Sequence, residues 1–222
     1  MTDFPFDIVG FDLDGTLFDT KADLAAALNH ALAQDGRPAL SVEAVEPMVG
    51  RGTRFMLQQG LEATGGADAE TAKRLYADLL DYYDANIANG TTIYPGLIDA
   101  LDLLAGRGVK LAIVTNKLER LAVKLVAALG MTDRFACLIG GDTVGVSKPA
   151  PEPILEMVRR CGGGRAAFVG DSIFDTQAAR NAGVPSVAVS FGFRINALEE
   201  LGADVVIDHY AELVPALERL GA

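Results

Sequence analysis

The sequence of 222 residues is poor in cysteine and histidine, with two of each. Two cysteines in a chain of this size do not make a disulfide framework, and Cys137 lies in an apolar run that is typical of a core residue. His30 lies in a helical segment and His209 near the C-terminus, so neither resembles a metal ligand. We therefore expect a cytoplasmic protein without a metal site built from thiolates or imidazoles.

Basic residues are also scarce, with 19 Lys and Arg against 30 Asp and Glu, which gives a net charge of −11. This balance argues against nucleic acid and against an anionic membrane surface as partners. No apolar run approaches the roughly 20 residues of a membrane helix, and residues 1–5 lack the basic segment of a signal peptide. A small anionic substrate stays compatible, because a metal ion and a few local bases can invert the field within a site. The chain is compatible with a monomer or a homodimer.

Short apolar runs typical of buried strands alternate with segments of helical spacing. Strands are predicted over residues 8–11, 109–114, 137–139, 166–169, 185–189 and 204–207. Strands separated by helices indicate a parallel sheet with right-handed crossovers. Residues 20–88 contain no convincing strand. The sequence therefore predicts an α/β fold: a Rossmann-like, doubly wound core of residues 1–19 and 89–222, with a helical domain of residues 20–88 inserted.

Two carboxylates, Asp12 and Asp14, follow the first predicted strand, residues 8–11. The period of a strand places them on the same side. Like charges that lie so close raise each other's pKa, so a cation is needed to neutralise the pair. Gly15 then allows a sharp turn at the end of the strand.

Other polar residues also stand where predicted strands end. Thr115 ends a later strand, and Asp171 another. Since ligands of parallel sheets bind outside the carboxyl ends of the strands, we expect Asp12, Asp14, Asp171 and Asp175 to lie together. A cluster of carboxylates suits Mg²⁺, which prefers oxygen ligands.

These residues could support phosphoryl transfer. A metal-held carboxylate can act as a nucleophile toward phosphorus and form an aspartyl-phosphate. Such a reaction needs an acid or base, a cation for the phosphoryl oxygens and hydrogen-bond donors to orient them. Asp14 is placed for the first task and Lys148 for the second, while Thr115 and the backbone N–H of Asn116 can supply donors.

The chain resembles the haloacid-dehalogenase superfamily of phosphatases over essentially its whole length. Asp12-Leu13-Asp14-Gly15-Thr16 matches the first motif of that family, Thr115 the second, Lys148 the third and residues 170–175 the fourth. One Asp-x-Asp recurs by chance, but four motifs in the right order and spacing are specific.

The resemblance implies a role for each motif residue. Asp12 would be the nucleophile, and Asp14 the general acid and then the base, with its carboxyl free to move protons. Mg²⁺ would be held by the Asp12 carboxylate, the Asp14 backbone carbonyl and Asp171. Asp175 would orient a metal-bound water or Lys148.

The helical insert matches the small cap of this family, which closes over the site and carries substrate specificity. Arg51 and Arg54 lie in a glycine-broken loop of the insert and are candidates for binding a substrate carboxylate or phosphate, with a surface position as the alternative.

Two further phrases are similar to phosphoglycolate phosphatases. The first is Gly140-Gly141-Asp142-Thr143 followed by Lys148-Pro149-Ala150-Pro151-Glu152-Pro153, and the second is residues 188–193. The second departs from that pattern, because Phe193-Arg194 stand where relatives often have tyrosine and asparagine. The function implied is Mg²⁺-dependent hydrolysis of a small organic phosphate, with phosphoglycolate as the leading substrate.

Several alternatives stay open. A β-phosphoglucomutase-like phosphotransferase, or a sugar-phosphate or pyrophosphate phosphatase of the same superfamily, would keep all four motifs. Asp14 argues against a dehalogenase, and the arginines of the insert loop cannot form the Schiff base that a phosphonate hydrolase needs. A phospho-aspartate receiver domain shares the acidic cluster and Mg²⁺ but lacks the helical insert.

Overall fold

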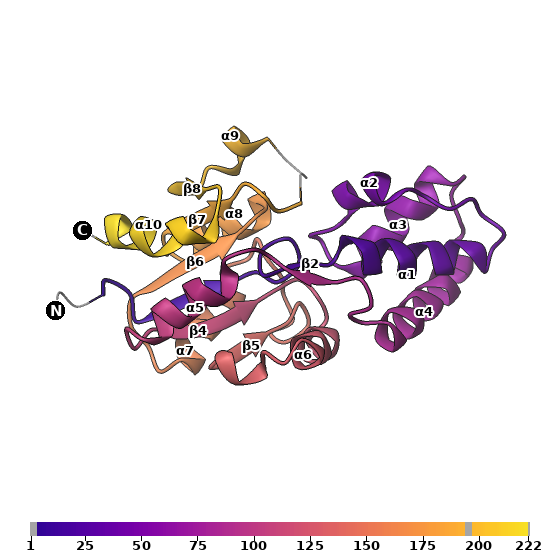
Figure 1. The fold of residues 1–222 in the computed structure, drawn as a ribbon. Helices are drawn as coiled ribbons and strands as arrows, with labels where there is room; N and C mark the ends of the chain where they lie inside the picture. Colours follow the sequence, from indigo (N-terminus) through magenta and orange to yellow (C-terminus); the bar gives the residue numbers. More distant parts are fainter. Residues whose placement is uncertain (1–3, 194–196, 222) are drawn as a thin grey trace.

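A computed structural model describes residues 4–193 and 197–221, so Arg194 of the departing phrase lies outside the described residues. Its main feature is a parallel six-stranded sheet in the order β5-β4-β1-β6-β7-β8 (Figure 1). The strands are β1 (Ile8–Phe11), β4 (Lys110–Val114), β5 (Cys137–Ile139), β6 (Ala166–Gly170), β7 (Ser186–Val189) and β8 (Val205–Ile207). The predicted α/β fold with a parallel sheet is therefore confirmed.

Helices cover both faces of this sheet. Successive strand residues point to opposite faces, so Val9 packs in one apolar cluster and Ile8 in the other. The first face is covered by α5 (Leu97–Ala105), α6 (Glu119–Ala128) and α10 (Leu213–Leu220). The second is covered by α7 (Glu152–Arg160) and α8 (Ile173–Asn181). The strands are buried on both faces, which explains their continuous apolar runs.

Four helices form a separate unit beside the sheet, called the helical unit below (Figure 1). They are α1 (Lys21–Ala33), α2 (Val42–Val45), α3 (Thr53–Ala63) and α4 (Ala69–Ala85), with a 3₁₀ turn over Glu46–Met48. Leu28 and Leu32 of α1 pack with Leu75 and Leu79 of α4, and all four side chains are fully buried. Helix α3 begins at Thr53, so Arg54 lies in its first turn and not in the loop that the sequence suggested.

A short antiparallel ribbon joins the helical unit to the sheet. It pairs β2 (Phe18–Asp19) with β3 (Thr92–Ile93). The buried carboxylate of Asp23 in α1 strengthens the same connection between the helical unit and the sheet. It accepts hydrogen bonds from Gly90 N at 2.8 Å and Thr91 Oγ1 at 2.7 Å. The ribbon was not predicted from the sequence.

The remaining described elements are short: α9 (Leu198–Leu201) and two 3₁₀ turns over Thr132–Arg134 and Tyr210–Glu212. Across residues 4–193 and 197–221, no helix combines the length and apolarity needed to cross a membrane. Cys137 and Cys161 are free thiols. Cys137 is half-buried, so it is less enclosed than the predicted core residue.

Candidate active site

Three buried carboxylates meet at the carboxyl end of the sheet. Asp12 follows β1, Asp171 follows β6, and Asp175 lies in the first turn of α8. Strands β1 and β6 are neighbours in register, with Phe11 opposite Val169, so Asp12 and Asp171 leave the sheet side by side. One oxygen from each of the three carboxylates lies within 4.8 Å of the other two. Three of the four acids that the sequence pointed to are thus brought together.

The Asp171 carboxylate is held from both sides. Thr16 Oγ1 donates to its Oδ1 at 3.0 Å, and Phe193 N donates to its Oδ2 at 2.8 Å. Gly15, at φ 83°, approaches so closely that a Cβ there would collide with Asp171 Oδ2. The turn after Asp14 therefore needs glycine both for its conformation and for this approach.

Lys148 lies between two of the carboxylates. Its Nζ is 2.8 Å from Asp12 Oδ1 and 2.6 Å from Asp175 Oδ1, and it donates to Val114 O at 2.8 Å. The other oxygen of Asp175 accepts from Ser172 N and Ser172 Oγ at the start of α8. Asp175 therefore anchors Lys148 and caps the helix at once.

The charges in this cluster are unbalanced. Burial, opposed by Lys148 and reinforced by Asp175, raises the pKa of the Asp12 carboxyl to about 6. Burial, with the charges of Asp175 and Asp12, raises the pKa of Asp171 well above its usual range. Burial lowers the pKa of Lys148, but Asp12 and Asp175 raise it more, so the net shift is upward. The cluster thus holds three carboxylates and one ammonium, which pairs with Asp12 and Asp175, so it attracts a further cation.

A divalent cation fits the residues present. Asp12 Oδ1 is buried and, within the described part of the chain, accepts no hydrogen bond of normal geometry, although Lys148 Nζ lies near. The donor set is made of oxygen atoms, which suits Mg²⁺. Asp12 and Asp171 are the residues that would hold it. Among the described residues, Asp12 Oδ1 lacks a hydrogen bond, and Asp171 is held by uncharged donors alone, whereas Asp175 is paired with the Lys148 ammonium and caps α8.

The raised pKa of Asp12 predicts a pH dependence of stability in protein stripped of divalent cations. The carboxyl of the unfolded chain ionises with its ordinary pKa of 3.8, while the buried one resists ionisation up to about 6. The free energy of unfolding of the wild type should therefore fall, relative to Asp12→Asn, as the pH rises from about 4 to about 6, by roughly 3 kcal/mol. Urea unfolding in EDTA across this range measures it, with the exposed Asp99→Asn as control. A pH-independent difference would contradict it.

The Asp14 carboxylate does not lie with the other three acids, contrary to the expectation from the strand ends. Lys117 Nζ donates to both of its oxygens at 2.8 Å, and Thr20 Oγ1 donates to Oδ1 at 2.7 Å. The two lysines thus divide the acids, with Lys148 serving Asp12 and Asp175 and Lys117 serving Asp14.

Lys117 is the functional candidate that the sequence reasoning did not select. It stands two residues after Thr115 at the end of β4, so the rule that ligands gather at strand ends applies to it as well. The motif match drew attention to Thr115 alone. The signal in the sequence that could have indicated a functional role for Lys117 is its position in a turn directly after a buried strand.

Thr115 and Asn116 shape the same edge. Thr115 is buried, and its Oγ1 accepts a hydrogen bond from Lys117 N at 3.2 Å. Asn116 Nδ2 donates to Gly50 O of the helical unit at 2.9 Å and to Lys148 O at 3.1 Å, and its Oδ1 accepts from Lys148 N. The side chain of Asn116 therefore ties the loop of Lys148 to the helical unit.

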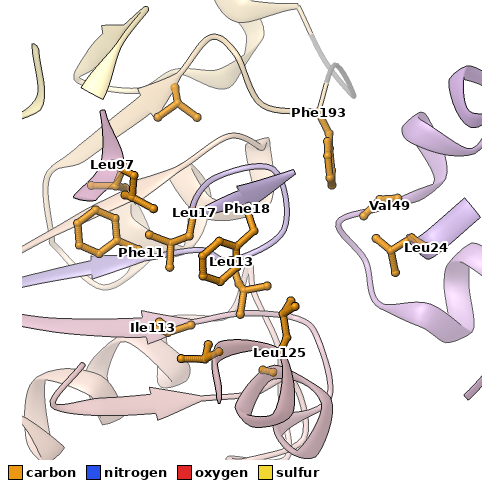
Figure 2. Close-up of a cluster of buried hydrophobic side chains, with 14 of the residues drawn as sticks. Phe11, Leu13, Leu17, Phe18, Leu24, Val49, Leu97, Ile113, Leu125 and Phe193 are labelled. Atoms are coloured by element: carbon orange, nitrogen blue, oxygen red, sulfur yellow. The ribbon is translucent and has the colours of Figure 1, made fainter. Parts of the chain in front are cut away.

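An open pocket of about 360 Å³ lies between the sheet edge and the helical unit. Figure 2 shows Leu24 and Val49 of the helical unit opposite Phe193 of the core. The residues that line the pocket come from both parts: Asp12, Asp14, Thr115, Asn116 and Lys117 from the core, and Leu24, Val49, Gly50, Gly52, Thr53 and Met56 from the helical unit.

Arg51 and Arg54 do not line this pocket. The Arg51 guanidinium lies 4.2 Å from the Phe55 ring centroid and 5.7 Å from that of Phe174 in α8, so it spans from the helical unit to the core. The Arg54 guanidinium stacks 4.4 Å from the Tyr76 ring centroid of α4. In this conformation both arginines pack on aromatic rings.

A model of the haloacid dehalogenase-like hydrolase family matches residues 9–189. The chain belongs to this family. The resemblance predicted from the four sequence motifs is confirmed, and the motif residues Asp12 and Asp171 of this haloacid dehalogenase-like hydrolase form the carboxylate cluster described above.

Its relatives match over most of their length. The phosphoglycolate phosphatase of Caulobacter vibrioides is 42% identical over 211 residues, which cover 94% of this chain and 89% of the relative. That of Agrobacterium fabrum is 43% identical, with 93% and 90% covered. Among solved structures, a predicted phosphoglycolate phosphatase from Haemophilus somnus has a TM-score of 0.90 at 28% identity, covering 96% and 98%. CbbY from Rhodobacter sphaeroides in complex with phosphate has a TM-score of 0.79 at 25% identity, covering 94% and 96%.

Proposed function

We propose that this chain is a Mg²⁺-dependent phosphomonoester hydrolase that cleaves 2-phosphoglycolate through a phosphorylated aspartate. The observation that carries the chemistry is the buried Asp12 carboxylate, which lines the pocket and is held 2.8 Å from the Lys148 ammonium. The choice of substrate is supported by relatives above 40% identity that are named phosphoglycolate phosphatase. The pocket combines polar groups of the core with apolar side chains of the helical unit, as small-molecule sites commonly do.

In the first half-reaction, an oxygen of Asp12 attacks phosphorus and the bond from phosphorus to the glycolate oxygen breaks. Lys148 offsets the charge of the phosphoryl oxygens, and Thr115 Oγ1 with the N–H of Asn116 can orient them. Asp14 gives a proton to the departing oxygen. The products of this step are free glycolate and phosphorylated Asp12.

In the second half-reaction, water attacks the phosphorus of phosphorylated Asp12. Asp14 takes a proton from that water, the bond from Asp12 to phosphorus breaks, and inorganic phosphate leaves. Mg²⁺, when bound by Asp12 and Asp171 with the Asp14 backbone carbonyl, supplies positive charge that offsets the negative charge of the phosphoryl group. Asp175 keeps Lys148 in position throughout.

The helical unit acts in this proposal as a cap of residues 20–88 on a core of residues 1–19 and 89–222. Its connection through the β2–β3 ribbon supports this division, because a two-stranded ribbon can bend while both parts stay folded. The hydrogen bond from Asn116 Nδ2 to Gly50 O holds the two parts together in the present conformation. Arg51 spans the same junction and could turn from Phe174 toward a substrate carboxylate on closure. Arg54 packs on Tyr76, farther from this route.

A sugar phosphate is the second candidate substrate. CbbY from Rhodobacter sphaeroides, in a form carrying a substitution, was solved with xylulose-1,5-bisphosphate and has a TM-score of 0.78 to this chain at 25% identity. A β-phosphoglucomutase-like transfer or a pyrophosphatase would use the same core residues. These activities differ from the proposed one in the product, or in the ester that is preferred.

A panel of phosphate esters tests the proposed function. We expect Mg²⁺-dependent release of inorganic phosphate, with phosphoglycolate giving a higher kcat/KM than sugar phosphates or pyrophosphate. EDTA should abolish the release and added Mg²⁺ should restore it. A panel led by a sugar phosphate or pyrophosphate would overturn the choice of substrate but not the chemistry. A single phosphorylation without turnover would instead indicate a receiver-type switch.

A further inference from the structure

Lys117 is a buried cation with one carboxylate partner. Its side chain is 1% exposed, and among the ion pairs of the described residues Asp14 is its acidic partner, with Nζ 2.8 Å from both carboxylate oxygens. A buried ammonium is costly unless it is paired and hydrogen-bonded. The position of Lys117 therefore constrains where the Asp14 carboxylate can lie.

The backbone of Lys117 is itself held at both ends. Its N–H donates to Thr115 Oγ1 at 3.2 Å, and its carbonyl accepts from Gly141 N at 2.8 Å. Its Nζ also lies 4.7 Å from the ring centroid of Tyr83, a fully buried residue of α4. The ammonium thus contacts both an aromatic ring and a carboxylate, which restricts its movement.

This arrangement keeps Asp14 apart from the acids that suit the metal. Asp14 lines the pocket together with Asp12, Thr115 and Lys117, whereas Asp171 and Asp175 do not line it. Without Lys117, the Asp14 carboxylate would keep the hydrogen bond from Thr20 Oγ1 and could turn about it away from the pocket. Lys117 removes that option by pairing with both oxygens.

We propose that Lys117 is a positioning residue that holds the Asp14 carboxylate on the pocket side, where it can take the proton from the water that attacks phosphorylated Asp12. The proposal rests on the proposed function and adds a residue that acts through Asp14. Lys117 touches neither Asp12 nor the metal-binding acids in the structure, in contrast to Lys148. Its effect should therefore pass through Asp14, and with a leaving group that departs without a proton it should be confined to the second half-reaction.

Lys117→Met removes the ammonium with little change in volume, and p-nitrophenyl phosphate is the probe. The leaving group of p-nitrophenyl phosphate departs without a proton, so kcat/KM reports the attack by Asp12. With this probe we expect hydrolysis of phosphorylated Asp12 to limit kcat. We expect kcat to fall by roughly 10²-fold, with KM falling by a similar factor and kcat/KM nearly unchanged. Phosphorylated protein should accumulate at steady state, as measured by mass spectrometry after an acid quench.

Two further variants make the test specific. In an Asp14→Asn background, Lys117→Met should cause no additional loss of kcat, because the residue it serves is already gone. Lys124→Met is the matched control. Lys124 of α6 pairs at 2.7 Å with Asp84 of α4, the helix that also carries Tyr83, but this pair lies at the surface. Its substitution should leave all constants unchanged. If Lys117→Met does not fold, Lys117→Arg is the second variant, because it keeps the charge. We then expect a smaller fall of kcat, again with kcat/KM nearly unchanged.

Several outcomes would overturn the proposal. Equal losses of kcat and kcat/KM would indicate a structural role for Lys117, as would a further loss in the Asp14→Asn background. A loss of kcat/KM on phosphoglycolate, but not on the carboxylate-free 2-hydroxyethyl phosphate, would make Lys117 a substrate-binding residue instead. Failure of the proposed function looks different, because the wild type itself would then form no phosphorylated protein.

Discussion

Asp12→Asn should remove turnover while leaving the fold intact. The amide cannot form a stable ester with phosphorus, so the reaction loses its nucleophile, and a loss of roughly 10⁴-fold or more in kcat is expected. The substitution preserves shape at a site that is 7% exposed and removes a buried charge that Lys148 only partly offsets. Phosphate release from phosphoglycolate or p-nitrophenyl phosphate measures the loss, and circular dichroism with thermal melting checks the fold.

Asp99→Asn makes the same chemical change on the exposed side of α5 and should keep wild-type activity. Mass spectrometry of acid-quenched reactions should detect phosphorylated protein in the wild type and none in Asp12→Asn. Substantial turnover by Asp12→Asn would remove Asp12 from the role of nucleophile. A phosphorylated species mapped to another residue would do the same.

The core of the fold could be predicted because its signals are local. The strand Ile8–Phe11 and the strand Cys137–Ile139 have the bounds that their apolar runs indicated. Each of these runs packs against helices on the sheet faces, so every residue of the first strand is buried and alternation is absent. Helix α6 ends at Ala128, shortly before Gly130, whose positive φ of 68° is typical of a residue that ends a helix.

The β2–β3 ribbon, which joins the helical unit to the sheet, could not be predicted in the same way. Phe18–Asp19 and Thr92–Ile93 are two residues long, which is too short for any periodic signal. Their pairing joins segments on either side of the whole helical unit. Only the three-dimensional course of the chain brings them together, and neither segment carries a glycine or proline pattern that indicates a hairpin.

The acidic site was predicted in part for a related reason. The proximity of Asp12 and Asp171 could be predicted, because neighbouring parallel strands end at the same edge of the sheet and each of these residues follows such a strand. It could not reveal that Asp14 would pair with Lys117, a residue 103 positions away, since several bases at that edge were possible partners. Charge balance at close range depends on side-chain directions that spacing does not encode.

Lys148→Met should cost both stability and activity, because Lys148 is the cation for two buried carboxylates. Its side chain is 2% exposed, and it is paired with Asp12 and Asp175. Removing one partner from a buried ion pair costs about 3–5 kcal/mol. The raised pKa of Lys148 keeps it charged at neutral pH, so this contribution is fully present there and is lost only at strongly alkaline pH. Urea unfolding in EDTA at pH 7 measures it, with the exposed Lys73→Met as control.

The double variant Lys148→Met, Asp175→Asn separates the two roles of this lysine. The second change removes one of the unpaired charges, so much of the lost stability should return. Activity should stay at least roughly 10²-fold below wild type, because the charge that offsets the phosphoryl oxygens is still missing. Recovery of both properties together would show that Lys148 serves only to neutralise Asp175. Mg²⁺ should stabilise Lys148→Met more than the wild type, since the ion then faces Asp12 without a competing ammonium.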